Sequence, residues 1–312
     1  MDLGVAVVSY NTRDLTAACL GALFASLEQS ALDARVWVVD NASSDGSAAM
    51  VAERYPQAVL IASDENLGFA GGTNLAIEAM RDEPGGLPRH VLLLNPDTVV
   101  EPDAVPRMVS YLDANPHVGV VGAQLLYPDG SFQHGAFRFP TLPMILFDFW
   151  IINHRLINSR LNGRYPRRLY EAGQPFPIDH PLGAALMIRR EALEQVGLLD
   201  TGYFMYCEEV DWCMRIKAAG WAVYCVPRAR IVHHAGGSTR QFRDRMFIAL
   251  WRSRFRLFDR HYGRVYRTLA RVIVRAGLRR DLARLRREVA RGLVSPDEAE
   301  RRAAAYHTVM EM

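Results

Sequence analysis

The first candidate for chemistry in this sequence is Asp97, which stands directly after an apolar run from Val91 to Leu94. Such a run predicts a fully buried strand, and Pro96 ends it because proline lacks an amide hydrogen. In open α/β sheets, ligands bind at the carboxyl ends of the strands. A carboxylate presented there is suited to hold a hard divalent cation against phosphate oxygens. The structural alternative is a turn aspartate that caps the next helix, and this segment alone leaves both open.

A second candidate centre is the acidic cluster of Glu208, Glu209 and Asp211, which is predicted to open a helix running to about Ala219. The helix dipole favours acidic residues in a first turn, so the cluster has a structural alternative. Asp211 also has an ion-pair partner one turn further on, Arg215. Apolar neighbours can raise the pKa of a glutamate toward the range of a general base. We therefore favour Glu209 as a catalytic base.

Two adjacent histidines, His233 and His234, form the third candidate group, and they precede a Gly-Gly-Ser turn. A single histidine is most often a hydrogen-bonded core or surface residue. A pair beside a glycine turn favours a role as a ligand to a metal or to phosphate.

Strands that alternate with helices are expected to position these residues. Asp14 is the expected cap of the first helix, which should run to about Gln29. The alternation predicts an α/β fold with a mostly parallel central sheet. The apolar segments of strand type are residues 4–9, 36–39, 59–62, 91–94, 182–188 and 221–226.

Polar residues recur where the early strands end, at Tyr10, Asn11 and Asp40. The Asp40 carboxylate could accept hydrogen bonds from the ring imide of a pyrimidine or from a ribose hydroxyl. The glycine-rich segment 68–72 would let backbone amides approach a diphosphate at a helix start. Its spacing matches neither a Walker loop nor a dinucleotide-binding fingerprint. Each feature alone fits a turn or a cap, but together they favour a nucleotide crevice at one sheet edge.

Composition and charge limit the class of protein. The 312 residues are 50% hydrophobic, enough for one large α/β domain with an appendage or for two domains. Four cysteines show no metal or disulfide spacing, which predicts a reducing cytosol. The chain shows no secretory signal, and its longest apolar run, residues 144–152, is too short to span a bilayer.

The formal net charge of +3 is unevenly distributed, because residues 240–291 contain 17 arginines and only four carboxylates. Two helices are predicted there, with apolar residues at helical spacings between the arginines. Such helices suit the headgroup region of an anionic bilayer, but they could also pack on the catalytic domain or form a dimer. The apolar residues are Phe242, Phe247, Leu250, Trp251, Phe255 and Phe258 in the first helix, and Leu269, Val272, Ile273 and Ala276 in the second.

The motifs VVSYN, VVDNASSDGS, ENLGFAGGTN, LLLNPDTVV, YFMYCEEVDWCMR and HHAGGST occur in the order seen in family 2 glycosyltransferases. The sequence most resembles the rhamnosyltransferase-like branch that builds bacterial cell-surface polysaccharides, over about residues 4–240. The resemblance implies a GT-A fold with a nucleotide-sugar half at 1–126 and an acceptor and catalytic half at 127–240. A helical, Arg-rich extension at 241–312 would follow. It also implies an inverting sugar transfer that uses Mg²⁺ or Mn²⁺.

The resemblance implies specific metal and catalytic residues. Asn95-Pro96-Asp97 stands at the family's Asp-x-Asp motif, so Asp97 would bind the metal, with His233 and His234 as further ligands. Glu208-Glu209 stands at the Glu-Asp motif, whose second residue is the base. Because this chain has Glu in place of that Asp, Glu208 and Asp211 stay open as alternatives to Glu209.

The implied nucleotide-sugar contacts lie in the strand ends and the glycine-rich segment. They are Tyr10, Asn11, Asp40, Asn66, Gly68, Phe69, Gly71, Asn74 and Asn95. The implied donor is dTDP-rhamnose, with a UDP-sugar as the alternative, and the implied acceptor is polyprenyl-linked or a glycan. The enzyme would work in the cytoplasm, peripherally on the inner face of the cell membrane, with an anionic membrane surface or a second copy as further partners.

Two other functional classes are weighed against this prediction. A uridylyl-type sugar-nucleotide enzyme would share the crevice but should carry a basic pyrophosphorylase-type loop, which the sequence lacks. A nucleic-acid-binding protein would explain the arginines, yet it would leave Asp97, Glu209 and His233 without a purpose, so we expect no nucleic acid partner.

Overall fold

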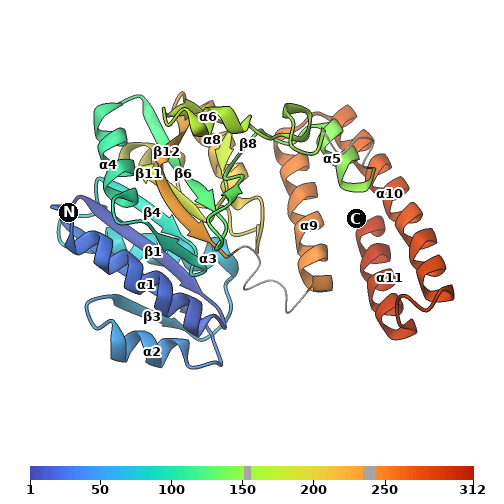
Figure 1. The fold of residues 1–312 in the computed structure, drawn as a ribbon, viewed down its shortest axis with the longest axis horizontal. Coiled ribbons are helices and arrows are strands. Elements are labelled where there is room, and N and C mark those ends of the chain that lie inside the picture. The colour runs from blue at the N-terminus through green and yellow to red at the C-terminus, as the bar shows by residue number, and fades with distance from the viewer. Residues whose placement is uncertain (151–155, 235–242) are drawn as a thin grey trace. The chain divides into compact units, whose positions relative to one another are not determined.

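The computed structural model describes residues 1–150, 156–234 and 243–312 of the chain, which forms two compact units (Figure 1). The sheet unit contains Met1–Arg138, Tyr165–Phe204 and Glu208–Ser238. The helical unit contains Phe139–Arg164, Met205–Cys207 and Thr239–Met312. The second unit thus begins its long C-terminal part close to the expected boundary at residue 240, and it also includes two segments of the expected acceptor half, residues 139–164 and 205–207. The functional division into halves stays a prediction.

The sheet unit is built on a ten-stranded sheet with the order β3-β2-β1-β4-β11-β6-β12-β5, in which β7 pairs with β6 and β9 with β12. Strands β1 to β4 pair in parallel, whereas β11 is antiparallel to both β4 and β6. The predicted α/β fold with a mostly parallel central sheet is thus confirmed. The strands are β1 Leu3–Ser9, β2 Ala34–Asn41, β3 Val59–Ser63, β4 His90–Leu94, β5 Thr98–Val100, β6 Val118–Leu126, β7 Phe132–Gln133, β9 Phe176–Pro177, β11 Ala185–Arg189 and β12 Ala222–His233; β8 Ala136–Phe137 pairs separately with β10 His180–Pro181.

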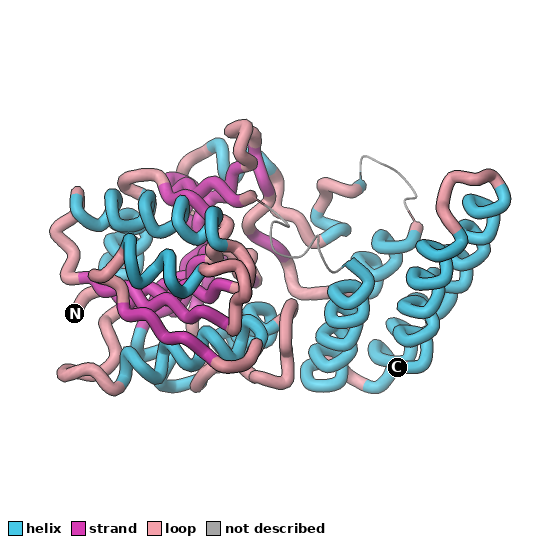
Figure 2. Tube along the Cα trace, turned by 90° about the horizontal axis from the view of Figure 1, so that it is seen from below, coloured by secondary structure: helices cyan, strands magenta, loops and turns pink. Residues whose placement is uncertain are grey.

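Helices lie on both sides of this sheet, as Figure 2 shows. Every residue of β1 and β4 is buried, which explains why these strands are apolar throughout rather than alternating. The helices of the sheet unit are α1 Arg13–Glu28, α2 Ser47–Arg54, α3 Gly68–Arg81, α4 Ala104–Ala114, α6 Arg167–Glu171, α7 Arg190–Val196 and α8 Glu208–Ala218.

The expected cap of the first helix is wrong by two residues. Thr12 occupies the N-cap position of α1, and Asp14 lies inside the first turn. The Thr12 hydroxyl lies 3.1 Å from that of Ser9 and 3.2 Å from that of Thr16. Asp14 instead places its charge near the helix N-terminus, where the dipole favours it.

The helical unit consists of α5 Leu142–Phe149, a short 3-10 helix at Arg160–Asn162, α9 Arg243–His261, α10 Arg264–Ala290 and α11 Pro296–Glu311. Its core is aromatic: Trp251, Phe255 and Phe258 are buried, and Phe149 stacks on Trp251 with ring centroids 5.5 Å apart. Gly277 lets α10 approach closely, because a Cβ there would meet the Phe149 ring at 2.2 Å. None of the described helices is long and apolar enough to cross a membrane.

The structure therefore corrects the prediction that the aromatic residues of the first C-terminal helix face a membrane. Trp251, Phe255 and Phe258 pack inside the helical unit, so this face of α9 already has partners. Phe242, the first residue of that predicted face, lies outside the described residues.

Candidate active site

Asp97 lies in the tight connection between β4 and β5, held from both sides by backbone hydrogen bonds. The Asn95 amide donates to the Ala184 carbonyl at 2.9 Å, and the His234 amide donates to the Asp97 carbonyl at 2.9 Å. Strand β5 begins at Thr98, which pairs with His233 of β12. The side chain of Asp97 is buried, so its carboxylate is fixed at the carboxyl end of a central strand, as the sequence predicted.

His233 lies close to Asp97, with its Nε2 atom 3.5 Å from the Asp97 Oδ1 atom. The His233 Nδ1 atom lies 3.1 Å from the Oε1 atom of Gln133. With Nδ1 as the donor to Gln133, a neutral ring turns the lone pair of Nε2 toward the carboxylate. The pair thus presents a carboxylate oxygen and an imidazole nitrogen, both groups that bind divalent cations.

This pair fits a cation that is shared with phosphate. In the described part of the chain, no group of three or more His, Cys, Asp and Glu side chains could hold a metal ion. Mg²⁺ is commonly bound by one or two carboxylates together with substrate phosphates and water, so two protein ligands are sufficient. The His234 side chain is partly exposed, and its role as a third ligand stays a prediction.

Glu209, the favoured base, lies in the first turn of α8 against the backbone of Gly183. The Gly183 amide donates to the Glu209 carboxylate. A Cβ atom at Gly183 would lie 3.7 Å from the Glu209 Cδ atom, so glycine permits this close approach. Gly183, just before β11, is thus the backbone position against which Glu209 packs.

Burial separates the proton affinities of the two adjacent glutamates. Burial raises the pKa of Glu209 to about 7. Hydrogen bonds from backbone amides lower this pKa, but their effect is smaller than that of burial. Burial and the charge of Glu209 raise the pKa of Glu208 well above its ordinary value. The Oε2 atom of each is buried without a hydrogen-bond partner. Glu209 therefore ionises first, near neutral pH, and Glu208 stays protonated, a pattern typical of an assigned base beside a neutral neighbour.

Asp211, the other alternative for the base, is engaged in an ion pair that holds the fold together. Its side chain is fully buried, and its Oδ2 atom lies 2.8 Å from the Nε atom of Arg215. Arg215 also donates to the carbonyls of Val196 and Leu198 at 2.7 and 2.9 Å. The pair thereby fastens α8 to the chain segment that follows α7.

The predicted nucleotide residues at the ends of β1 and β2 meet in one loop cluster. Asn11 has a φ of 51° and accepts a hydrogen bond from the Ser44 amide at 2.8 Å. Asp40 accepts from the Ser43 amide through Oδ2 at 3.0 Å, while its Oδ1 atom is buried without a hydrogen-bond partner. Tyr10 is partly exposed beside them. The Oδ1 atom of Asp40 can therefore accept a hydrogen bond from a bound ligand.

Asn41 is a positioning residue that the sequence analysis passed over. Its Nδ2 atom donates to the Asn66 side chain and to the Gly68 carbonyl, both at 3.0 Å, and its Oδ1 atom accepts from the Leu67 amide at 3.0 Å. Asn41 therefore holds the start of the glycine-rich segment. Its place next to Asp40 at a strand end was the only available signal.

In the glycine-rich segment, two of the amides expected to approach a diphosphate have partners within the protein. The Gly68 amide donates to the Asn66 side chain at 2.9 Å, and the Phe69 amide donates to the Phe204 carbonyl at 2.9 Å. The glycines instead permit close packing: a Cβ at Gly68, where φ is +71°, would lie 2.2 Å from the Phe204 oxygen, and one at Gly71 would lie 2.8 Å from Leu67 Cβ. The first amides of α3 are already engaged within the protein.

Asn74, predicted to contact the nucleotide-sugar, is also engaged within the protein. Its carboxamide donates to the Leu199 carbonyl at 2.8 Å and accepts from the Leu199 amide at 3.1 Å. Asn74 is buried, so we assign it a structural role that holds the loop after α7 against α3.

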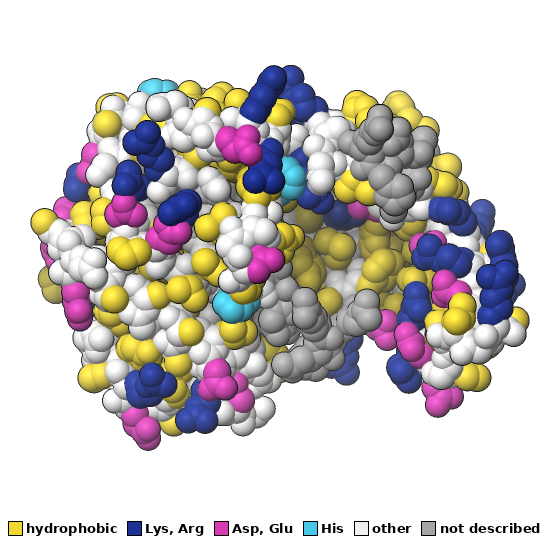
Figure 3. Space-filling view, viewed as in Figure 1, with side chains coloured by type: hydrophobic (Ala, Val, Ile, Leu, Met, Phe, Trp, Pro, Cys, Tyr) yellow, Lys and Arg dark blue, Asp and Glu magenta, His cyan; other side chains and the backbone are white. Residues whose placement is uncertain are grey.

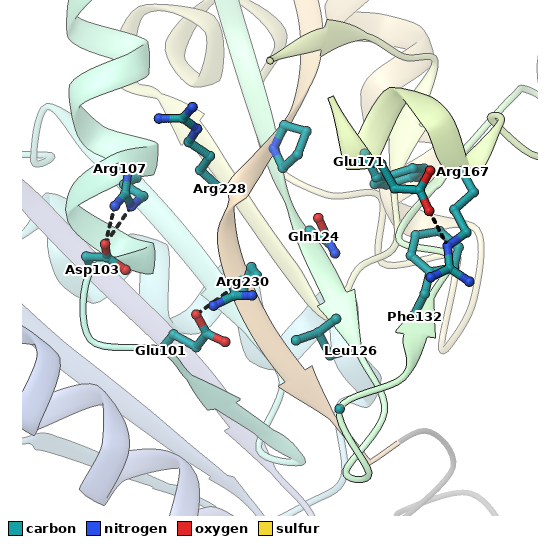
Figure 4. A pocket seen from close by; sticks show the side chains of 13 residues that line it. Glu101, Asp103, Arg107, Gln124, Leu126, Phe132, Arg167, Glu171, Arg228 and Arg230 are labelled. Atoms are coloured by element: carbon teal, nitrogen blue, oxygen red, sulfur yellow. Dashed lines mark hydrogen bonds and ion pairs between the residues drawn. The ribbon is translucent and has the colours of Figure 1, made fainter. Parts of the chain in front are cut away.

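A polar pocket of about 470 Å³ opens elsewhere in the sheet unit (Figure 4). It is lined by residues of α4, α6, β6 and β12, and none of the predicted site residues is among them. Three of its four arginines pair with carboxylates of the same lining: Arg107 with Asp103, Arg167 with Glu171, and Arg230 with Glu101. The pocket is therefore distinct from the candidate site around Asp97.

Comparison with known proteins gives concordant matches. Residues 4–197 match the model of glycosyl transferase family 2. The chain is 31% identical over 239 residues to N-acetylglucosaminyl-diphospho-decaprenol L-rhamnosyltransferase of Mycobacterium tuberculosis, covering 73% of this chain and 76% of that protein. It is 25% identical over 199 residues to rhamnosyltransferase WbbL of Escherichia coli, covering 62% of this chain and 70% of that protein.

Among solved structures, the mannosyltransferase PcManGT of Pyrobaculum calidifontis, in complex with GDP-Man and Mn²⁺, is similar in fold. Its TM-score is 0.55 at 19% identity, over 99% of this chain and 84% of that one. The N-terminal part of the S. aureus protein TarS is also similar, with a TM-score of 0.51 at 14% identity over 100% of this chain and 90% of that one.

Proposed function

Since the chain belongs to glycosyl transferase family 2, we propose that it transfers a rhamnosyl group from a nucleoside diphosphate to a lipid-linked acceptor. Two of its relatives are named as rhamnosyltransferases, and one of these names an acceptor attached to decaprenol through a diphosphate. The observation that carries the proposal is that Glu209, with its raised pKa, and the Asp97–His233 pair lie at the same end of the sheet.

The sheet register brings this base and this pair together. Ala185 opposes Leu94 in the antiparallel pairing of β11 with β4, and the Ala184 carbonyl accepts from the Asn95 amide. Gly183, one residue further, therefore lies beside the turn that ends in Asp97. The Glu209 carboxylate accepts a hydrogen bond from the Gly183 amide. It therefore lies at the end of the sheet where β4 ends and β11 begins.

In the proposed reaction, Glu209 takes the proton of an acceptor hydroxyl. The hydroxyl oxygen attacks the anomeric carbon of the donor sugar from the face opposite the diphosphate. The bond between the anomeric carbon and the diphosphate oxygen breaks as the new glycosidic bond forms, so the configuration inverts. Near and above pH 7, enough Glu209 is ionised to act as the base, and the neutral Glu208 beside it adds no competing charge.

Asp97 and His233 are the residues that would hold a divalent cation, Mg²⁺ or Mn²⁺, with His234 as a further candidate ligand. Such a cation neutralises charge on the diphosphate and makes it a better leaving group. The contact of His233 Nδ1 with Gln133 supports this assignment, because it orients the ring with Nε2 toward Asp97.

For the donor, we favour dTDP-rhamnose, with a UDP-sugar as the alternative. The partnerless Oδ1 atom of Asp40 could accept the ring imide N–H of a pyrimidine. Since guanine also presents N–H donors, the preference for dTDP-rhamnose rests on the relatives named as rhamnosyltransferases. Tyr10 and Asn11, at the end of the neighbouring strand, would complete the nucleoside contacts.

The proposal is tested by product analysis with purified protein, Mn²⁺ or Mg²⁺, and a polyprenyl-diphosphate-linked N-acetylglucosamine acceptor. A panel of dTDP-, UDP- and GDP-sugars should show acceptor-dependent release of nucleoside diphosphate, highest with dTDP-rhamnose. Release of pyrophosphate would instead indicate a uridylyl-type enzyme. Turnover with a GDP-sugar and none with a pyrimidine donor would overturn the donor assignment.

A further inference from the structure

Helix α10, Arg264–Ala290, carries apolar side chains on two opposite sides. One side is buried in the helical unit and includes Ala270, Val274, Gly277, Leu278 and Leu285. This side packs against the unit's own helices, as the contact of Gly277 with the Phe149 ring shows. The apolar residues of the other side need a separate explanation.

The second side, here called the α10 stripe, consists of Val265, Leu269, Val272 and Ala276. Their spacings of four, three and four residues place them in one row along the helix. Val265 is 74% exposed, Leu269 43% and Val272 56%, and Ala276 is exposed as well. Large aliphatic side chains in a contiguous exposed row mark a site of interaction with another surface.

Arginines border the α10 stripe. Arg264, Arg275 and Arg279 follow one edge of the row at helical spacings, and all three are exposed. Within the described part of the chain, Arg264 and Arg279 have no carboxylate partner. Figure 3 shows that Lys and Arg side chains gather on the side of the molecule where the C-terminal helices lie.

We propose that the α10 stripe docks on a bilayer of anionic phospholipids, with the aliphatic side chains among the acyl chain ends and the arginines on the phosphates. A helix that combines an apolar row with basic edges is suited to this position. The purpose of the contact rests on the proposed function, because a polyprenyl-linked acceptor is held in a membrane. The contact itself is independent of catalysis.

A second copy of the chain is a poorer partner for this face. A twofold dimer places the same patch against itself, and in an antiparallel pair of α10 helices the arginine edges of the two stripes would face one another. Like charges brought together in this way destabilise the interface. Lipid phosphates supply the opposite charge, and the structure therefore favours the membrane surface.

The test is flotation of the full-length protein with vesicles of phosphatidylcholine alone and of phosphatidylcholine with phosphatidylglycerol, at low and high salt. The protein should float with the anionic vesicles at low salt. The triple variant V265S/L269S/V272S should lose flotation. The variant R264Q/R279Q should bind roughly 30-fold more weakly, since each basic residue near an anionic surface contributes on the order of 1 kcal/mol.

Matched control variants remove the same groups elsewhere. L161S removes a leucine that is 54% exposed in the same unit, and R81Q/R301Q removes two exposed arginines. Both should float like the wild type, and circular dichroism should show all variants folded. Flotation of the triple variant at wild-type levels, or no flotation of the wild type, would overturn the proposal. The proposal would also fail if the wild type formed a dimer and bound no vesicles, while the triple variant was a monomer. Because flotation needs no substrate, its failure is distinguishable from failure of the proposed reaction.

Discussion

Replacing Glu209 with glutamine should remove most of the transfer activity and at the same time stabilise the folded chain above neutral pH. The change is nearly isosteric, and the Oε1 atom of a glutamine can still accept the hydrogen bond from the Gly183 amide. Loss of a general base lowers turnover by about 10²–10⁴-fold. Donor binding, which depends on other residues, should be retained.

The stability effect follows from the raised pKa. Burial raises the pKa of Glu209 from 4.5 to about 7 in the folded chain. Below pH 4.5 both the folded and unfolded states hold the proton, so the folded wild type suffers no penalty there. As the pH rises to 7, only the unfolded chain ionises freely. The wild type therefore loses up to about 3 kcal/mol of stability across this interval, and E209Q does not.

Two measurements check this reasoning. In wild-type enzyme, kcat/KM should rise with pH below about 7 and level off above it, and this limb should be absent from the residual activity of E209Q. Urea unfolding of both proteins should show a stability difference that is small at pH 4.5 and grows toward pH 8. E208Q is the matched control, and because Glu208 is already neutral at working pH, it should keep activity within about tenfold. A crippled E208Q beside an active E209Q would refute the assignment of the base.

The remaining predictions concern the cation pair, the glycine-rich segment and the buried ion pair. Asp97→Ala should abolish transfer and the response to Mn²⁺, since the diphosphate then leaves without its cation; wild-type activity that survives EDTA would contradict this. Gly68→Ala should destabilise by about 1–3 kcal/mol, because φ is +71° and the new Cβ would lie 2.2 Å from the Phe204 oxygen. Gly46→Ala, also at positive φ but with nothing within 4 Å, should cost only about 1 kcal/mol in urea unfolding, and equal losses would refute the packing argument. Asp211→Asn should destabilise by about 3 kcal/mol, because it breaks an ion pair whose carboxylate is fully buried and leaves Arg215 without its charge partner; a stable but inactive D211N would instead return Asp211 to the candidates for the base.

The sequence by itself was sufficient for features that depend on neighbours along the chain. Apolar runs identified the buried strands, because a strand covered on both faces must be apolar throughout. The break at Pro96 placed Asp97 at a strand end, and the order of motifs indicated the family that the comparison confirms. The apolar neighbours of Glu209 along the chain predict the raised pKa that its burial produces.

Only the tertiary structure decided features that depend on contacts between distant segments. Gln133, which orients His233, lies 100 residues away and reaches it through the pairing of β7 with β6. The sequence predicts that Asn74 contacts the nucleotide-sugar, but its carboxamide is hydrogen-bonded to the backbone of Leu199, 125 residues further on.

The two C-terminal helices show the same limit. Both carry apolar residues at helical spacing, and spacing alone does not tell which apolar row meets a neighbouring helix. Packing buried the aromatic row of α9 against Phe149 and left the row at Val265, Leu269 and Val272 exposed. Periodicity defines a face of a helix, but what covers that face is set by the packing of the other helices.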